Sequence, residues 1–167
     1  MSPRNMVLIG MPGAGKSTIG VLLAKALGMS FVDTDLLIQE REGRLLQSII
    51  DQDGVAAFLQ IEANVVLGLN RENSVIATGG SVIYSEPAVT HLKVNGRLVY
   101  LQLTLAEIEQ RIQNMASRGI ALGKGQQLSD LFAERVVLYE KHADRIVDCS
   151  GLSIEESVQK IVLLHLG

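Results

Sequence analysis

The chain alternates between short apolar segments and longer amphipathic ones. The short segments have the length and apolar character of buried β-strands, and they cover residues 6–10, 30–35, 74–80, 97–103 and 145–150. Apolar positions at three- and four-residue spacing predict helices over 16–28, most of 35–70, 104–115 and 153–166, with a break at 51–54. Strands that alternate with helices are typical of a parallel sheet. We therefore expect an α/β fold in which residues 1–167 form a single domain.

Composition narrows the class of protein further. Hydrophobic residues make up 47% and charged residues 20% of the 167 residues, which suits one globular core. The formal net charge is -3 without a basic block, so we expect neither nucleic acid nor a membrane surface as a partner. The single cysteine, Cys149, permits no internal disulfide, and the apolar run at the N-terminus is too short for a signal peptide. These features predict a cytoplasmic protein, which we expect to be a monomer.

The strongest motif is the sequence GMPGAGKST at residues 10–18. It matches the pattern G-x-x-x-x-G-K-[ST] between a predicted strand and a predicted helix, which is the context that a phosphate-binding loop requires. The glycines allow backbone N–H groups to converge on an anion, and the helix N-terminus faces the same point. Lys16 would reach the β- and γ-phosphates, and Ser17 would ligate Mg²⁺. The alternative is a glycine turn that only precedes a helix, and the complete motif argues against it.

Two carboxylates and two glycines follow the next predicted strands. Asp33 and Asp35 lie two residues apart, so their side chains share one side if the strand continues through them. One could hold a magnesium-bound water while the other accepts a proton from an alcohol; the alternative is that one of them only caps the next helix. Gly79 and Gly80 end the third strand at the same edge of the sheet. They would let a ligand approach the backbone, although a turn with positive φ would explain them equally well.

Three arginines in the second half of the chain are further candidates for the site. Arg111 and Arg118 are seven residues apart, at the end of a predicted helix and in the loose, glycine-containing segment that follows it. We expect a mobile lid over about 113–128. Arg135 lies within the sequence ERVVLYEKHAD. An arginine on a helix face is most often a surface residue, but a lid arginine beside a phosphate loop can stabilise charge on a transferring phosphoryl group.

Taken together, these motifs resemble the shikimate kinase family. The resemblance runs nearly from end to end, through the sequences LIGMPGAGKSTIGVLLAKAL, FVDTD, FLQIE, VIATGG and ERVVLYEKHAD and the Arg111–Arg118 pair. It implies a three-layer αβα fold of the nucleoside-monophosphate-kinase type, with a five-stranded parallel sheet, an acceptor-binding helical region at about 34–70 and a closing lid. It also implies transfer of the γ-phosphate of ATP, with Mg²⁺, to the 3-hydroxyl of shikimate, a small hydroxyl acid of aromatic amino acid biosynthesis.

The resemblance assigns the nucleotide side of the site residue by residue. Asp33 resembles the aspartate on the magnesium side, where Ser17 would be its companion. Arg111 resembles the arginine that packs against adenine, and Arg118 the lid arginine on the phosphates. The residues that match the nucleotide-binding loop are Gly13, Ala14, Gly15, Lys16, Ser17 and Thr18. Among all the residues on the nucleotide side, the resemblance implies that Lys16 and Arg118 act in catalysis.

The acceptor side matches in part. Asp35 resembles the aspartate that binds and activates the acceptor hydroxyl, Gly79 and Gly80 match the glycine turn at the acceptor, and Arg135 resembles an arginine that grips its carboxylate. However, Leu59 stands where the family has a second acid-binding arginine, and Ser81 stands where the family has a third glycine. Glu62, which in the family would orient that arginine, is left without it.

These departures leave the acceptor open between two kinds of molecule. The first reading is shikimate, held with fewer charges or with a compensating group such as Lys124. The second is another small alcohol, of the gluconate or homoserine type, on the same fold. A third hypothesis, from a different class, is a nucleotide-binding protein without turnover, but a carboxylate placed to activate a hydroxyl argues against it.

Overall fold

The computed structural model describes residues 4–114 and 125–167. Within these residues, five strands form one parallel sheet in the order β2-β3-β1-β4-β5. The strands are β1 (Asn5–Ile9), β2 (Ser30–Asp33), β3 (Ser74–Ala77), β4 (Gly96–Gln102) and β5 (Arg145–Asp148). The predicted α/β fold with a five-stranded parallel sheet is therefore confirmed.

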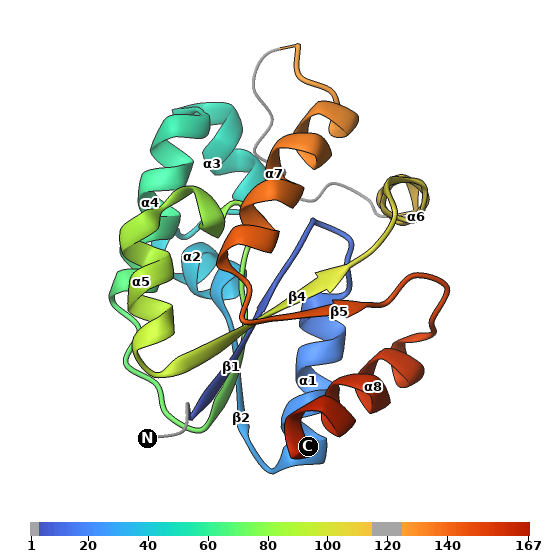
Figure 1. Cartoon of the computed structure of the whole chain (residues 1–167). Helices are drawn as coiled ribbons and strands as arrows, with labels where there is room; N and C mark the ends of the chain where they lie inside the picture. The colour runs from blue at the N-terminus through green and yellow to red at the C-terminus, as the bar shows by residue number, and fades with distance from the viewer. Residues whose placement is uncertain (1–3, 115–124) are drawn as a thin grey trace.

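Helices cover both faces of the sheet, which gives the three-layer arrangement (Figure 1). α1 and α8 lie on one face, and α4, α5 and α7 lie on the other, with α2 and α3 packed beside α4. The bounds are α1 (Lys16–Leu27), α2 (Thr34–Glu42), α3 (Leu46–Asp53), α4 (Val55–Leu67), η1 (Val82–Tyr84, a 3₁₀ turn), α5 (Glu86–Val94), α6 (Leu105–Gln113), α7 (Leu128–His142) and α8 (Ile154–Leu166).

The central strand explains where the site forms. All five residues of β1 are buried, because β3 and β4 flank it and helices cover both of its faces. Val7 is paired with Ile76 on one side and with Leu98 on the other. After β1 the chain forms β2 and β3 on one side of this strand and then crosses to β4 and β5 on the other side. Ligands of open α/β sheets bind outside the carboxyl ends of the strands at such a switch point. The loop that follows β1 therefore emerges where a ligand site is expected.

The structure corrects the predicted extent of the second strand. β2 ends at Asp33, and Asp35 is the second residue of α2 rather than part of a strand through residue 35. The Oδ1 atom of Asp33 accepts hydrogen bonds from the backbone N–H groups of Asp35 (2.9 Å) and Leu36 (3.3 Å), which starts the helix. The side-chain alternation of a strand therefore does not relate the two carboxylates.

The helical region at 34–70 contains one more break than expected. The predicted break at 51–54 coincides with the end of α3 at Asp53, but α2 also ends early, at Glu42. Gly43 follows with a φ of 66°, a left-handed conformation that ends helices. The ion pairs of Arg44 with Glu42 (3.5 Å) and with Asp53 then connect this turn to the end of α3. The result is three short helices around their own apolar cluster.

Two expectations fall partly or wholly outside the described residues. The predicted lid at about 113–128 contains residues 115–124, which the structure does not describe, and Arg118 lies among them.

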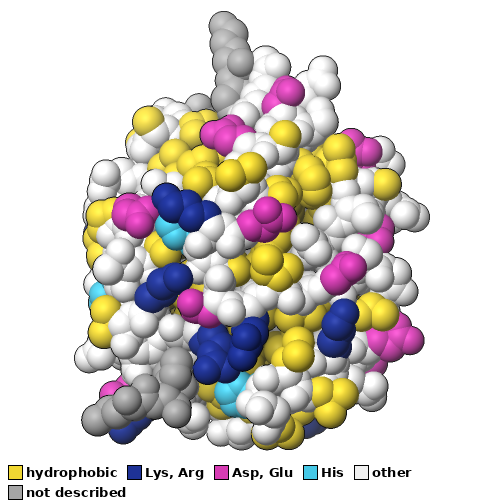
Figure 2. Space-filling model, in the orientation of Figure 1, with side chains coloured by type: hydrophobic (Ala, Val, Ile, Leu, Met, Phe, Trp, Pro, Cys, Tyr) yellow, Lys and Arg dark blue, Asp and Glu magenta, His cyan; other side chains and the backbone are white. Residues whose placement is uncertain are grey.

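The surface of the described part carries charges of both signs, intermixed with apolar side chains over the face shown in Figure 2. Within the described residues, no helix has both the length and the apolar character needed to cross a membrane.

Candidate active site

The loop between β1 and α1 has the backbone of a phosphate-binding loop. Gly13 and Gly15 have φ values of 83° and 88°, which glycine adopts without strain. Lys16 is the first residue of α1 and is 8% exposed, and its Nζ atom donates hydrogen bonds to the carbonyl oxygens of Gly10 (2.7 Å) and Met11 (2.8 Å). The lysine ammonium is thus held over the loop, beside the N-terminus of the helix, where a phosphate would bind.

The residues expected to hold magnesium lie together. The Oγ atom of Ser17 donates a hydrogen bond to the Oδ2 atom of Asp33, at 2.7 Å. The other oxygen of Asp33, Oδ1, caps α2. The same carboxylate therefore caps a helix with one oxygen and contacts Ser17 with the other, so a capping role does not exclude a role in the site. A hydroxyl and a carboxylate oxygen beside a phosphate loop are the hard oxygen ligands that Mg²⁺ prefers, so the donor set fits this ion.

A cavity of about 350 Å³ opens next to the loop. Its walls come from the phosphate loop, from the ends of β2 and β3, and from α2, α3, α4 and α7. The charged residues among them are Lys16, Asp33, Asp35, Glu62 and Arg135. The structure therefore brings the two predicted aspartates, the lysine and the arginine to one cavity, although they come from four different helices and strands.

Gly79 and Gly80 are needed for close approach rather than for an unusual backbone conformation. Neither has a positive φ. A Cβ atom at Gly79 would lie 2.9 Å from Asp35 Oδ1 and closer still to Glu62 Oε2. One at Gly80 would lie 2.9 Å from Arg135 Nη1 and equally close to a ring carbon of Pro12. The absence of these two side chains makes room for the charged groups of the cavity.

Arg135 is a buried residue of the cavity and not a residue of the helix surface. It is 1% exposed, its Nε atom donates to the hydroxyl of Tyr84 (3.3 Å), and its guanidinium carbon lies 5.3 Å from the centre of the Tyr84 ring. Tyr139, on the same helix, donates from its hydroxyl to the carbonyl oxygen of Gly80 (2.5 Å) and stacks on Tyr100. The contacts with Tyr84 hold the guanidinium of Arg135 at the wall of the cavity. The sequence predicted no role for Tyr84 or for Tyr139, although Tyr139 lies within the sequence ERVVLYEKHAD.

The carboxylate of Glu62 forms a hydrogen bond with Ser81 in this chain, where Leu59 replaces the arginine of the family. The hydroxyl of Ser81 donates to its Oε1 atom at 2.6 Å, so one departure on the acceptor side, Ser81, contacts the glutamate that the other departure, at Leu59, leaves without its arginine. Burial raises the pKa of Glu62 to about 7; the Ser81 hydrogen bond opposes this shift, Asp35 adds to it, and Arg135 and Lys16 oppose it. A carboxyl group with a pKa near 7 is partly protonated at neutral pH.

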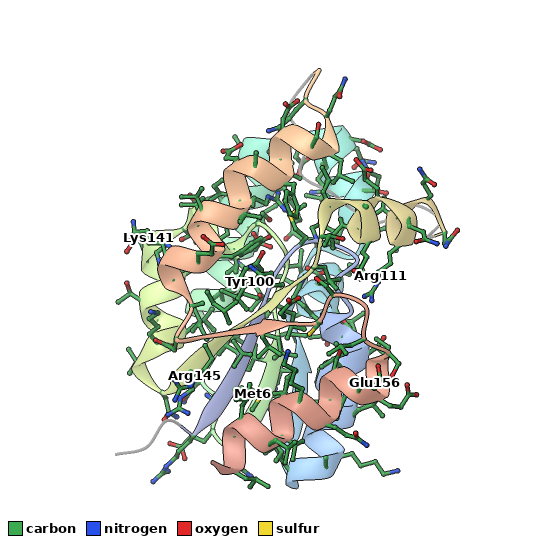
Figure 3. The ribbon with its side chains drawn as sticks, turned by 45° about the vertical axis from the view of Figure 1, so that its right-hand side comes forward. Met6, Tyr100, Arg111, Lys141, Arg145 and Glu156 are labelled. Atoms are coloured by element: carbon green, nitrogen blue, oxygen red, sulfur yellow. The ribbon has the colours of Figure 1, made fainter. Side chains whose placement is uncertain are left out.

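The other predicted residues that the structure describes do not line the cavity; they are Ala14, Thr18, Leu59 and Arg111. Arg111 donates from Nη1 to the carbonyl oxygen of Gly13 (3.2 Å), so it lies against the phosphate loop, and Figure 3 shows it extending from α6 toward α1. Ala14 is buried within the loop, and Thr18 is exposed on the first turn of α1. Leu59 packs against the apolar cluster of α2, α3 and α4, and it is not among the described residues that line the cavity.

The fold and the site together define a class of protein. A phosphate-binding loop at the switch point of a parallel sheet, with a charged cavity directly beside it, is the arrangement of a P-loop kinase that phosphorylates a small molecule. The comparisons with known proteins specify the family. The model of the shikimate kinase family matches residues 12–164.

Individual relatives agree with this match. A shikimate kinase from Actinobacillus succinogenes is 39% identical over 95% of this chain and 93% of its own, and one from Methylococcus capsulatus is 35% identical over 95% and 90%. The structure of shikimate kinase from Acinetobacter baumannii in complex with shikimate superposes with a TM-score of 0.87, at 32% identity over 99% of this chain and 94% of that one. The chain belongs to the shikimate kinase family.

Proposed function

We propose that this protein transfers the γ-phosphoryl group of ATP to the 3-hydroxyl of shikimate. The observation that carries the proposal is the cavity that places Asp35 and Arg135 beside Lys16 and Ser17 of the phosphate loop. Family membership supports shikimate over gluconate or homoserine as the acceptor, and a phosphotransferase over a protein that only binds nucleotide. The relatives' kinase activity implies ATP as the phosphate donor.

The loop side would hold the donor. The backbone N–H groups of residues 13–18 and the ammonium of Lys16 would bind the β- and γ-phosphates. Ser17 Oγ and Asp33 Oδ2 would ligate Mg²⁺, which when bound neutralises charge on the phosphate oxygens. Arg111, which already contacts the loop, would pack against the adenine. Arg118, in the lid at about 113–128, would bind the phosphates on closure.

The cavity side would hold the acceptor, in the region of α2 to α4. Arg135 would bind the carboxylate of shikimate with charge-assisted hydrogen bonds, kept in position by Tyr84. Asp35 would accept the proton of the 3-hydroxyl of shikimate. As this proton leaves, the hydroxyl oxygen of shikimate would form a bond to the γ-phosphorus, and the bond from that phosphorus to the β-γ bridging oxygen would break. The products are shikimate 3-phosphate and ADP. We further propose that the protein works in the cytoplasm as a monomer, without nucleic acid or membrane partners.

A coupled assay of ADP formation tests this function. With Mg²⁺ and ATP present, shikimate should raise the rate of ADP formation well above the rate without acceptor, and the product should be a monophosphate ester of shikimate by mass spectrometry. Gluconate, homoserine and quinate serve as controls that share a hydroxyl or a carboxylate. Faster turnover of one of these controls than of shikimate would overturn the proposed acceptor.

A further inference from the structure

The cavity contains a buried carboxylate oxygen whose hydrogen-bonding capacity is unused. Glu62 is 2% exposed, and Ser81 occupies only its Oε1 atom. Its Oε2 atom is buried and has no hydrogen-bond partner among the described residues. Buried polar atoms of folded proteins nearly always have partners, so a vacant oxygen in the wall of a ligand cavity indicates a ligand group that completes it.

The neighbours of Glu62 on its own helix offer no hydrogen-bond donor to this oxygen. On α4, the residues one turn earlier are Phe58 and Leu59, and neither side chain can donate a hydrogen bond. Leu59 packs into the apolar cluster instead of toward the cavity. The positive charges of Lys16 and Arg135 lower the pKa of Glu62, against the larger effect of burial. The carboxyl group is thus held through Oε1 by one serine, and its buried Oε2 atom has no hydrogen-bond partner among the described residues.

The vacant oxygen lies next to the group that faces the acceptor. Glu62 Oε2 and Asp35 Oδ1 both flank the side of Gly79 where a side chain would be. A molecule that presents one hydroxyl to Asp35 therefore brings its neighbouring ring position close to Glu62. On a ring with adjacent hydroxyls, the second hydroxyl can donate to Glu62 Oε2.

We propose that Glu62 is a specificity-determining residue that accepts a hydrogen bond from a non-reacting hydroxyl of the acceptor, with Ser81 holding its carboxyl group in place. This inference rests on the proposed function and narrows its substrate class. The acceptor is a carboxylic acid with at least two hydroxyls, one phosphorylated and one recognised by Glu62. Acids with a single hydroxyl are poor acceptors of this enzyme.

A cycle between enzyme variants and acceptor hydroxyls tests the contact. kcat/KM is measured for shikimate and for its 4-deoxy and 5-deoxy analogues, each of which keeps the 3-hydroxyl, with the wild type, Glu62→Leu and Glu62→Gln. For the wild type, loss of the recognised hydroxyl should lower kcat/KM by about tenfold or more, mainly through KM. For Glu62→Leu the same loss should have no effect, and Glu62→Gln, which keeps a polar group and nearly the same shape, should be intermediate.

Serine variants provide the matched comparison. Ser81→Ala should reduce the effect of the hydroxyl, because Glu62 is no longer held; Ser157→Ala, at a buried serine on α8, should leave it unchanged. If the effects of Glu62 substitution and of each hydroxyl are simply additive, Glu62 does not contact the acceptor and the inference is wrong. If no hydroxy acid is turned over by the wild type, the proposed function fails first, and the inference fails with it.

Discussion

Glu62→Gln should change the pH dependence of stability in a defined direction. The pKa of this carboxyl group rises from 4.5 to about 7 in the folded protein, chiefly through burial. Between these values the folded state keeps a proton that the unfolded state releases, so the free energy of unfolding of the wild type falls as pH rises. The full shift corresponds to about 3 kcal/mol at most. Glutamine does not titrate, so the variant lacks this loss.

Urea unfolding between about pH 5 and pH 8 measures the effect. Glu62→Gln should gain stability relative to the wild type as pH rises, with most of the gain complete slightly above pH 7. A constant offset, from the altered contact with Ser81, does not affect this slope. Glu109→Gln removes a carboxylate at an exposed position of α6 and should show no comparable slope. A difference between Glu62→Gln and the wild type that stays constant over this range would refute the reasoning.

Three further substitutions test the site. Leu59→Arg should tighten shikimate binding by roughly tenfold to 150-fold in calorimetry, because a charge-assisted hydrogen bond contributes about 1.5–3 kcal/mol. Leu59 itself does not line the cavity, so unchanged affinity would mean that an arginine at this position does not reach the acceptor. Asp35→Asn should lower kcat by at least about 100-fold with little change in the KM for ATP, and equal losses in both would assign Asp35 a structural role. Ser17→Ala should raise the Mg²⁺ concentration needed for half-maximal rate, and an unchanged magnesium dependence would remove Ser17 from the metal site.

The sequence predicted the features that depend on local pattern. Apolar runs of strand length identified the five strands within a few residues. The inner strands β1, β3 and β4 are largely buried, as expected where helices cover both faces of a parallel sheet, and the edge strands β2 and β5 are more exposed. The phosphate loop was recognisable since its glycines and lysine are consecutive in the chain. The end of α3 was predicted at the sequence DQDG, where a glycine permits the positive φ of a helix end.

Other features depend on contacts between distant segments and left no local signal. The family resemblance identified Arg135 as a candidate acceptor-binding residue, but its position in a charged helix does not show that it is buried, whereas the contact with Tyr84 in the structure does. The pairing of Glu62 with Ser81 joins a residue of α4 to the residue that directly precedes η1, so no local sequence pattern predicts this contact. The early end of α2 at Glu42 was missed because the apolar pattern continues into α3.

A crystal structure with shikimate and a non-hydrolysable ATP analogue would test the central claim most directly. The account predicts that the terminal phosphate lies against Lys16 and the loop, with the 3-hydroxyl of shikimate within hydrogen-bond distance of Asp35 and in line with the γ-phosphorus. A terminal phosphate directed away from Asp33 and Asp35, or an acceptor bound outside the cavity, would contradict it.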